Sequence, residues 1–521
     1  MSDPVIDQQF VSGTVITSDW LNGVNDFVNF DGALKTYVDT AVAPKLNAAD
    51  LANTSDVTKG DALIGFKQSL TGATASTVHA KLAQYVSVID FGAVGDGVAD
   101  DTAAIQAAFT AAERVYIPAG TYLCGALTSG TAKYIFGDGG LTSILKNVAG
   151  SGTILTLNSD LVEVVDMGFQ GNGTDTDSGV LISGNVVQLD KCYFDNFNKC
   201  VVQNNTHNEY RILNTTLATS NFGLYNTGAG INSKLFNCRI VSCKTAAFIN
   251  DVSLSSTEGI SFESCLIYDC GNSASNNAVF ELTSANYTRI FDSMIDGNNY
   301  IVIRADASQR LDVTGTYFAA NNSIANTPIV QLSNDCSLAK FVDCRLEFSP
   351  WYAIQLLGGV TGFSSDVLIE ACHFANNNSL GSGGDIIIDS CARTRLTGNV
   401  LATSGGISLA IVGTHRNSDV TVVNNRFATT PSIITSGCSL SGDTNSGYKN
   451  SDIAIQTIAN GNNQVVFNHN LNVLLGQQVV VVPGTTDPGQ PIGWTASSTT
   501  ITLSRSGTVG ALNVSYYVRL I

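Results

Sequence analysis

Proline, clustered positive charge and metal-binding cysteine patterns are scarce or missing in this 521-residue sequence. Only 9 prolines stand against 49 glycines, which favours many tight turns and argues against rigid linkers. The 12 cysteines include no CxxC pair and no Cys/His cluster with metal-ligand spacing, so we expect no metal, redox motif or cofactor. We expect free buried thiols instead, because disulfides are rare in proteins made in a reducing compartment.

The charge balance is acidic and shows no basic cluster. There are 26 Lys and Arg against 43 Asp and Glu, for a formal net charge of -17, and the basic residues are scattered singly. A nucleic-acid-binding surface needs clustered positive charge, so nucleic acid is not an expected partner. The balance also disfavours a highly anionic glycan, although one local basic patch could accept one.

Long hydrophobic runs are absent too. Residues 1–24 have no basic start, apolar stretch or small-residue cleavage site, so we expect no secretory signal. No apolar run reaches the roughly 18 residues that span a bilayer, so we expect no membrane insertion and synthesis in a host cytoplasm. With 44% apolar residues, the chain is too long for one compact core, which predicts several domains or an elongated repeat array.

A degenerate internal repeat from Val162 to Thr430 is the most informative feature of the sequence. Each copy has the form apolar-x-apolar-x-x-small-x-apolar, and we call its last apolar residue the anchor. The anchors are Phe169, Phe194, Leu217, Ile240, Ile267, Ile295, Phe318, Leu346, Phe374, Leu401 and Phe427. They are separated by 23 to 28 residues, which suits one short β-coil per copy with loops of variable length.

Two further positions of the repeat have a constant character. The residue five positions before the anchor is always apolar, which predicts a core column. The residue two positions before the anchor is mostly small, with thiols at Cys192, Cys238, Cys265, Cys344 and Cys372, and this suits the narrow interior of a solenoid. Apolar segments such as GVLIS, AVFEL and DIIID follow most anchors and indicate buried parallel strands. The predicted fold is all-β, a right-handed parallel β-helix with two or three short strands per coil.

The repeat stops before residue 450, and the patterns QVVFNHNL, QQVVVVPG, TITLSRS and LNVSYYVRLI follow it. These alternating segments predict the strands of a small β-sandwich-like domain. We therefore expect an N-terminal region at 1–85, the β-helix at 86–449, and a C-terminal β domain at 450–521 that serves trimerisation or glycan binding.

Two segments resemble the first segment of the pectate-lyase-like β-helix superfamily, particularly of bacteriophage tailspikes. They are VSVIDFGAVGDGVADDTAAIQAAF at residues 86–109 and VYIPAGTY at residues 115–122. The resemblance implies a first strand at Val86–Phe91. It also implies a helix over Thr102–Phe109, capped by Asp101, that covers one end of the solenoid; Asp is a good N-cap. The acidic residues here could also suggest a calcium loop, but the EF-hand spacing and terminal Glu are absent.

Residues 1–85 resemble phage tail proteins through VSGTVITSDWLNGVNDFV at 11–28 and KGDALIGFKQSL at 59–70. This implies a virion component that attaches to a phage tail or baseplate protein through its N-terminus and forms a homotrimer. Leu34, Val38, Ala41 and Lys45 are spaced like a short coiled-coil seam, but this segment is too short to be stable alone. Apolar residues that we expect to face outward, such as Val302 and Ile387, support the homotrimer.

The resemblance implies binding and cleavage of a bacterial surface polysaccharide, a capsule or O-antigen, and glycoside hydrolysis needs two carboxyl groups across the bond. Residues next to the anchor should face solvent on the same strand. Immediately after their anchors stand Asp296 and Glu347, two coils apart with Ala319 between them. Coils about 4.8 Å apart place their backbones roughly 9 to 10 Å apart, near the upper end of the inverting range.

Candidate sugar-binding residues surround this pair. Tyr317, Arg345 and His373 stand just before their anchors, and Trp351, shortly after Glu347, offers an indole for stacking on a sugar. The same Trp could pack at a subunit interface, and the carboxylates could be ordinary surface charges. Glu281, outward in AVFEL, is a third catalytic candidate on a different face.

Two other functions remain open from the sequence. A lyase would use a base to remove a proton α to a uronate carboxyl, which Arg345 would neutralise with Tyr317 and His373 nearby. A non-catalytic receptor-binding tail protein would only hold the glycan.

Overall fold

A computed structural model describes much of the chain. The described residues are 48–56, 58–150, 152–174, 176–204, 209–228, 231–251, 258–271, 274, 276–319, 324, 326–357, 364–380, 383–389, 391–403, 406–412, 420–429, 432–433, 440–441, 451–458, 464–468, 479–485, 492–497, 500–505 and 512–520. The chain divides into two compact units, residues 1–84 and 85–521. The expected coiled-coil segment at 31–46 lies outside the described residues.

The described part of the first unit contains short elements only. They are α2 (Ala48–Leu51), the 3-10 helix η1 (Gly60–Leu63), the antiparallel strands β1 (Gly65–Phe66) and β2 (Ser76–Thr77), and α3 (Val78–Leu82). Thr77 caps α3, because its side chain accepts a hydrogen bond of 3.1 Å from the backbone N–H of Ala80. None of the helices among the described residues has the length and apolar character needed to cross a bilayer.

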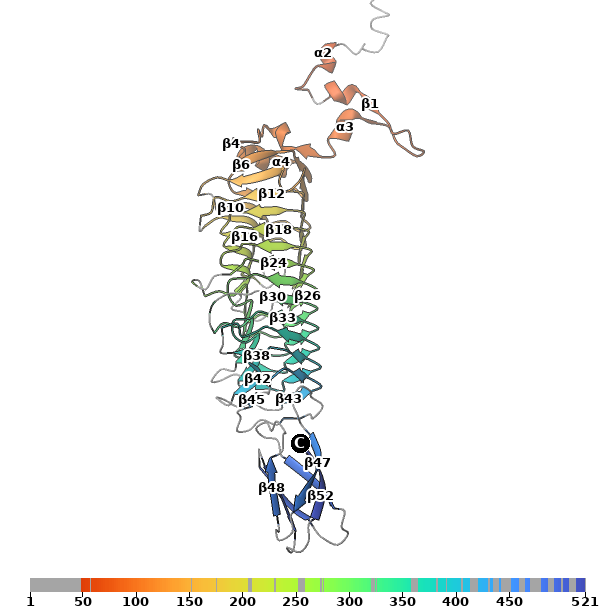
Figure 1. Cartoon of the computed structure of the whole chain (residues 1–521). Coiled ribbons are helices and arrows are strands. Elements are labelled where there is room, and N and C mark those ends of the chain that lie inside the picture. Colours follow the sequence, from red (N-terminus) through yellow and green to blue (C-terminus); the bar gives the residue numbers. More distant parts are fainter. Residues whose placement is uncertain are drawn as a thin grey trace, which may run out of the picture. The chain divides into compact units, whose positions relative to one another are not determined.

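From residue 85 the chain winds through three long parallel sheets, in the order sheet 1, sheet 2, sheet 3 within each coil (Figure 1). Sheet 1 has 15 strands: β3 (Val86–Ser87), β5 (Arg114–Ile117), β8 (Tyr134–Gly137), β11 (Glu163–Val165), β14 (Val187–Asp190), β17 (Tyr210–Leu213), β20 (Ile231–Phe236), β23 (Glu258–Glu263), β26 (Thr288–Phe291), β29 (Asp312–Thr314), β32 (Lys340–Val342), β36 (Leu368–Glu370), β40 (Arg395–Thr397), β43 (Val420–Val423) and β46 (Leu440–Ser441).

Sheet 2 has 14 strands: β4 (Asp96–Asp100), β6 (Gly120–Cys124), β9 (Ser143–Asn147), β12 (Gly168–Gln170), β15 (Tyr193–Asp195), β18 (Thr216–Ala218), β21 (Arg239–Val241), β24 (Leu266–Tyr268), β27 (Met294–Asp296), β30 (Tyr317–Ala319), β33 (Arg345–Glu347), β37 (His373–Ala375), β41 (Val400–Leu401) and β44 (Arg426–Phe427).

Sheet 3 has 13 strands: β7 (Leu127–Thr128), β10 (Thr153–Leu157), β13 (Ser178–Ile182), β16 (Lys199–Gln203), β19 (Phe222–Asn226), β22 (Ala246–Asp251), β25 (Phe280–Thr283), β28 (Ile303–Asp306), β31 (Val330–Ser333), β34 (Ile354–Leu357), β38 (Gly384–Asp389), β42 (Ile407–Val412) and β45 (Ser432–Ile433). A small parallel pair, β35 (Ser364–Ser365) and β39 (Cys391–Ala392), lies outside these sheets. The prediction of a parallel β-helix is confirmed.

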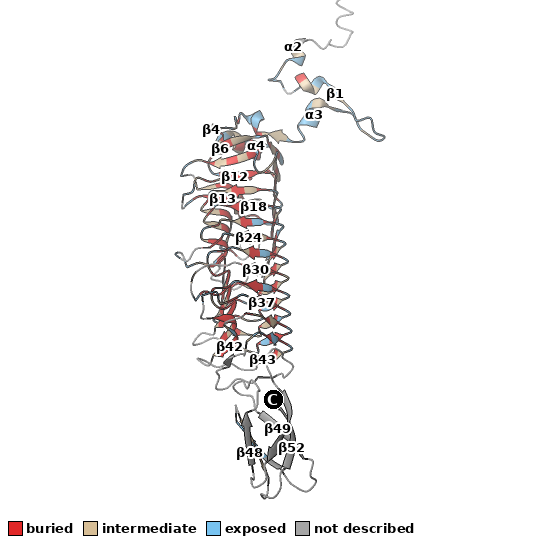
Figure 2. Cartoon of the chain, in the orientation of Figure 1, coloured by how far each residue is buried: buried red, intermediate tan, exposed pale blue. Residues whose placement is uncertain are grey.

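The register confirms the repeat residue by residue. Every anchor pairs with the next one across sheet 2, from Phe169 with Phe194 to Leu401 with Phe427. The apolar residues five positions earlier form the matching column of sheet 1, beginning with Val164 opposite Leu189. Both columns point into the solenoid, where the buried positions of Figure 2 follow one another from coil to coil.

A left-handed residue turns the chain from sheet 1 to sheet 2 in each of these coils. It stands three positions before the anchor, and its φ lies between 46° and 67° in all repeats: Asp166, Lys191, Asn214, Asn237, Ser264, Asp292, Gly315, Asp343, Ala371, Gly398 and Asn424. Gly, Asn and Asp tolerate this conformation best, and they occupy most of these places. The short turn keeps the anchor at the same place in each coil.

The start of the solenoid differs in part from the expectation. Only Val86–Ser87 form a strand, and Val88–Phe91 form the 3-10 helix η2, so the predicted strand over Val86–Phe91 is wrong from Val88 onward. Ser87 and Asp90 cap this turn reciprocally, which favours a helical turn over an extended one. The expected helix is present as α4 (Thr102–Ala111), which buries Ile105 and Phe109 against the first coils.

Asp101 stands at the N-cap position of α4, but its side chain does not cap the helix. Its carboxylate accepts the backbone N–H groups of Val94 (2.7 Å) and Gly95 (3.1 Å) instead, and it is almost fully buried. Asp100 accepts the N–H of Thr102 at 3.0 Å. The predicted capping role of Asp101 is therefore wrong, because the preceding loop folds back over the helix start and takes the carboxylate.

The cysteines of the described part of the chain are buried and free. Burial raises the pKa of Cys192 and of Cys200 to about 12, which disfavours the reactive thiolate. Their placement in the interior agrees with the small-residue column, and their redox state in solution stays a prediction.

Val302 is fully buried, so the expectation that it faces outward is wrong. It precedes β28, and its neighbour Ile303 pairs with Val330 in sheet 3. Ile387 does lie in the outer column of sheet 3, where it is half-buried and pairs with Gln355 and Ala410.

The described strands after residue 450 pair in antiparallel fashion. One sheet has the order β47 (Ser451–Ile458), β52 (Leu512–Leu520), β49 (Val479–Thr485), and the other has the order β48 (Gln464–Asn468), β51 (Thr500–Arg505), β50 (Ile492–Ala496). Two sheets of three strands agree with the predicted strand segments. The strands β47 and β50 were not predicted from the sequence.

Candidate functional site

The outer face of sheet 2 brings five of the predicted site residues together. Tyr317, Arg345 and His373 follow one another in register on β30, β33 and β37. In the column two positions further along the sheet, Asp296 on β27 pairs with Ala319 on β30, and Glu347 follows on β33. The anchors of these strands point inward, so period-two alternation sends all five side chains to the outer face.

Glu347 is the centre of this cluster. Its carboxylate accepts a hydrogen bond from Arg345 Nε at 2.7 Å and one from Tyr317 Oη at 3.2 Å. Only 4% of Glu347 is exposed, which is less than an outward position predicts. The exposed Arg345 guanidinium lies 5.8 Å from the Tyr317 ring centre, so these two side chains help to cover the carboxylate.

Two buried polar atoms in this cluster have no hydrogen-bond partner among the described residues. They are Asp296 Oδ1 and His373 Nδ1. Buried polar atoms are nearly always paired, so each such atom calls for an explanation. Both atoms are inaccessible to solvent in this structure, so a ligand could pair with them only after neighbouring side chains move.

Within this cluster the pKa values of Tyr317 and Arg345 are both raised. Burial raises the pKa of Tyr317, and the nearby negative charges of Glu347 and Asp296 act in the same direction. The hydrogen bond to Glu347 raises the pKa of Arg345, which keeps the guanidinium charged. Tyr317 thus remains a protonated donor between the two carboxylates.

Trp351 lies at the corner between sheets 2 and 3, in the segment that joins β33 to β34. It is half-buried and meets the Tyr352 ring edge-on at 5.0 Å between ring centres. Its Cδ1 would lie 2.7 Å from a Cβ at Gly383, so the glycine is needed for the indole to pack there. These contacts favour a packing role at the corner over an open sugar platform.

Glu281 lies on β25 of sheet 3, so the structure does not bring it into the sheet 2 cluster. It forms an ion pair of 3.1 Å with Arg304 on the next coil and accepts the N–H of Ala278 at 2.8 Å. Burial raises its pKa, and the nearby Asp306 adds to the effect.

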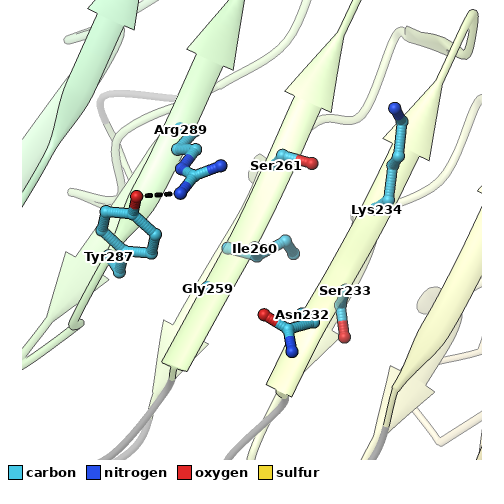
Figure 3. A pocket seen from close by; sticks show the side chains of 8 residues that line it. All are labelled: Asn232, Ser233, Lys234, Gly259, Ile260, Ser261, Tyr287 and Arg289. Carbon is cyan, nitrogen blue, oxygen red and sulfur yellow. Dashed lines mark hydrogen bonds between the residues drawn. The ribbon is translucent and has the colours of Figure 1, made fainter.

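A pocket on the outer face of sheet 1 was not predicted from the sequence. It has a volume of about 180 Å³ and is lined by eight residues of β20, β23, β26 and their starts, among them Lys234, Ser261, Tyr287 and Arg289 (Figure 3). The repeat contains a pattern that could have pointed to this pocket. The position six before the anchor is repeatedly basic, at Arg211, Lys234, Arg289, Lys340 and Arg395.

Comparisons with known proteins give the following matches. Residues 85–327 match the family model "Rhamnogalacturonase A/epimerase, pectate lyase-like". The tail spike protein of Shigella phage Sf6 is 40% identical over 82 residues, which span 15% of this chain and 13% of that protein. The mannuronan C5-epimerase AlgE3 of Azotobacter vinelandii is 47% identical over 77 residues, 12% of this chain and 4% of the enzyme.

Among solved structures, the tailspike protein gp49 of Pseudomonas phage LKA1 has a TM-score of 0.49 at 13% identity, covering 84% of this chain and 99% of that one. The two sequence matches span only a small part of the curated relatives, 13% of the tail spike protein and 4% of the epimerase. The match of residues 85–327 to this family model, the similarity to a phage tail spike protein and the three-sheet solenoid together support a tailspike or depolymerase of the parallel β-helix superfamily.

Proposed function

We propose that the protein is a phage tailspike that binds a bacterial surface polysaccharide and hydrolyses it with Asp296 and Glu347. The observation that carries the proposal is the buried Glu347 carboxylate, held by Arg345 and Tyr317 on the same face as the unpartnered Asp296 oxygen. Similarity to a phage tail spike protein supports the polysaccharide as the substrate class.

The spacing of the two carboxylates suits an inverting hydrolase. They lie two coils apart, so their backbones are roughly 9 to 10 Å apart, and inverting enzymes need room for a water molecule as well as the sugar. Ala319 lies between them and carries no bulk beyond a methyl group.

We assign Asp296 as the general acid and Glu347 as the base that activates water. Asp296 Oδ1 has no hydrogen-bond partner among the described residues, so no protein group competes for the proton that it would donate. Arg345 balances the negative charge of Glu347. Two hydrogen bonds, from Arg345 and Tyr317, fix the position of the Glu347 carboxylate, as a water-activating carboxylate requires.

The test is cleavage of capsule or O-antigen by the variants Asp296→Asn and Glu347→Gln. Each should lower turnover by about two to four orders of magnitude, the usual contribution of positioned proton transfer, while binding persists. The amides keep the shape of both side chains, and circular dichroism checks the fold. Asp195→Asn is the matched control, because Asp195 lies in the same outer column several coils away.

Near wild-type cleavage by both variants would refute the assignment and would make Glu281 with Asp306 the next pair to test. Mass spectrometry of the products decides the reaction class. Saturated oligosaccharides indicate hydrolysis, and unchanged polymer that still binds indicates a receptor-binding protein without catalysis.

A lyase is the second candidate, and the unpartnered His373 Nδ1 beside Arg345 favours it. In that reaction His373 removes the proton α to a uronate carboxyl, Arg345 neutralises the carboxylate, and Tyr317 protonates the leaving oxygen. The product would then carry a 4,5-unsaturated terminus and would form only from a uronate-containing glycan.

We further propose that the protein is a virion component that assembles as a homotrimer and attaches to a phage tail or baseplate protein through its N-terminus. Similarity to a tail spike protein and the tail-like sequence at 11–28 support this. The outward Ile387 supplies apolar surface for such an assembly.

A further inference from the structure

We propose that the pocket on sheet 1 binds one acidic sugar residue of a polysaccharide. It lies on a different sheet from Asp296 and Glu347, so the inference stands whether or not the sheet 2 cluster hydrolyses anything. It would hold the polymer on the spike as a second binding site. The argument rests on the shape of the pocket, its charge and its aromatic wall.

Two short residues in one coil create the hollow. Ser261 on β23 stands in register between Lys234 on β20 and Arg289 on β26, and both neighbours have long side chains. Gly259 is the second residue of the same strand, has φ of +88° and has no side chain to fill the space between Asn232 and Tyr287. The coil therefore recedes while its two neighbours form walls on either side (Figure 3).

The walls carry positive charge in a protein whose formal net charge is -17. Lys234 and Arg289 belong to one outer column of this sheet, in which Asp312 stands in register directly after Arg289. Lys234 is paired with Glu263, whereas no carboxylate among the described residues lies within ion-pair distance of Arg289. Arg289 therefore keeps guanidinium N–H groups for a carboxylate, which a planar fork can bind in bidentate fashion.

Tyr287 gives the pocket a surface suited to a sugar. Its ring lies 4.0 Å from the guanidinium carbon of Arg289, and its hydroxyl accepts a hydrogen bond from that side chain. The hydroxyl hydrogen of Tyr287 and the hydroxyl of Ser261 remain available to sugar oxygens, while an aromatic face suits the C–H face of a sugar ring.

The size of the pocket narrows the ligand. About 180 Å³ is well below the roughly 300 to 1,000 Å³ that drug-sized ligands need, so one ring or its acidic substituent fits. A phosphate group would also satisfy Arg289 and Lys234. A carboxylate and a phosphate share their negative charge. We propose a sugar carboxylate as the ligand, because inorganic phosphate alone has no apolar face that could pack on the Tyr287 ring.

The experiment is calorimetric titration of the full-length protein with oligogalacturonate, with the fully methyl-esterified oligomer and with inorganic phosphate. The ester has the same chain without the charge. We expect saturable binding of oligogalacturonate, at least tenfold weaker binding of the ester and no saturable binding of phosphate. Arg289→Gln should weaken oligogalacturonate binding at least tenfold, and Ser261→Gln should do the same by filling the hollow without changing the charge.

Arg395→Gln is the matched control, because Arg395 occupies the same outer column outside the pocket. It removes the same charge and should leave binding unchanged. Equal loss in Arg395→Gln and Arg289→Gln would overturn the proposal in favour of diffuse electrostatic attraction. Equal affinity for the ester, tight binding of phosphate alone, or no saturable binding of oligogalacturonate would overturn it too, and none of these results bears on cleavage at sheet 2.

Discussion

At the scale of single residues, Asp385 is a carboxylate whose ionisation is changed by burial in the solenoid interior. Asp385 on β38 is fully buried, and its carboxylate accepts hydrogen bonds from Thr403 and, at 2.8 Å, from Asn377 Nδ2. Burial raises the pKa of Asp385 from 3.8 to about 6, although both hydrogen bonds act in the opposite direction. The folded protein therefore holds this proton at pH values where the unfolded chain has lost it.

This predicts a loss of stability with rising pH. Between about pH 4 and pH 6 the folded state binds more protons at Asp385 than the unfolded state, so the free energy of unfolding falls across that window. The total change is on the order of 3 kcal/mol, since one pKa unit corresponds to about 1.4 kcal/mol. Urea unfolding midpoints measured from pH 4 to pH 7 would reveal it.

Asp385→Asn isolates the contribution, because the amide keeps an acceptor for Asn377 but cannot ionise. The stability of the variant relative to the parent should rise as the pH goes from 4 to 7. A difference between the two proteins that does not change with pH would contradict the assignment to Asp385.

At the scale of the elements, the corner between sheets 1 and 2 depends on one left-handed residue per coil. Ala371, which precedes β37, has φ of 53° and is exposed, so its Cβ strains the backbone without any burial in return. The left-handed region costs a residue with a Cβ roughly 1 to 2 kcal/mol, and glycine escapes this cost but loses more entropy on folding.

Ala371→Gly should therefore stabilise the protein by up to about 1 kcal/mol, measured as a higher urea midpoint. The backbone N–H of residue 371 can still donate to Thr397 O. Ala375→Gly is the matched control, because Ala375 lies in the extended strand β37 and glycine there should destabilise. If both variants shift the midpoint in the same direction, the strain at this corner is not what limits its stability.

At the scale of the whole molecule, the expected homotrimer should be measurable directly. The chain has a mass of 54.7 kDa, so light scattering of the purified full-length protein should give about three times that mass at micromolar concentration. The prediction rests on the outward side chain of Ile387 and on the tail-like N-terminus. A stable mass near 54.7 kDa would refute the trimer.

Much of the fold was determined by the sequence alone, because a solenoid is almost one-dimensional and each coil contacts its neighbours. The anchors such as Phe169 and Phe374 and the column that begins with Val164 identified the inner faces of sheets 2 and 1 from periodicity. The local turn chemistry at Asn214 or Gly398 likewise follows from residue type. These features depend on neighbours in the chain or one coil away, so a repeat is enough to reveal them.

Only the tertiary structure decided what covers or faces each outward side chain. Glu347 is buried because Arg345 and Tyr317 fold over it, Val302 points inward, and Asp101 binds a preceding loop rather than its helix. Such outcomes depend on side-chain packing and on irregular loop paths between coils. The alternation of apolar and polar residues assigns a residue to the inner or outer face of a sheet. The contacts that its side chain makes with other coils depend on side-chain conformations and loop paths, which the repeat does not specify.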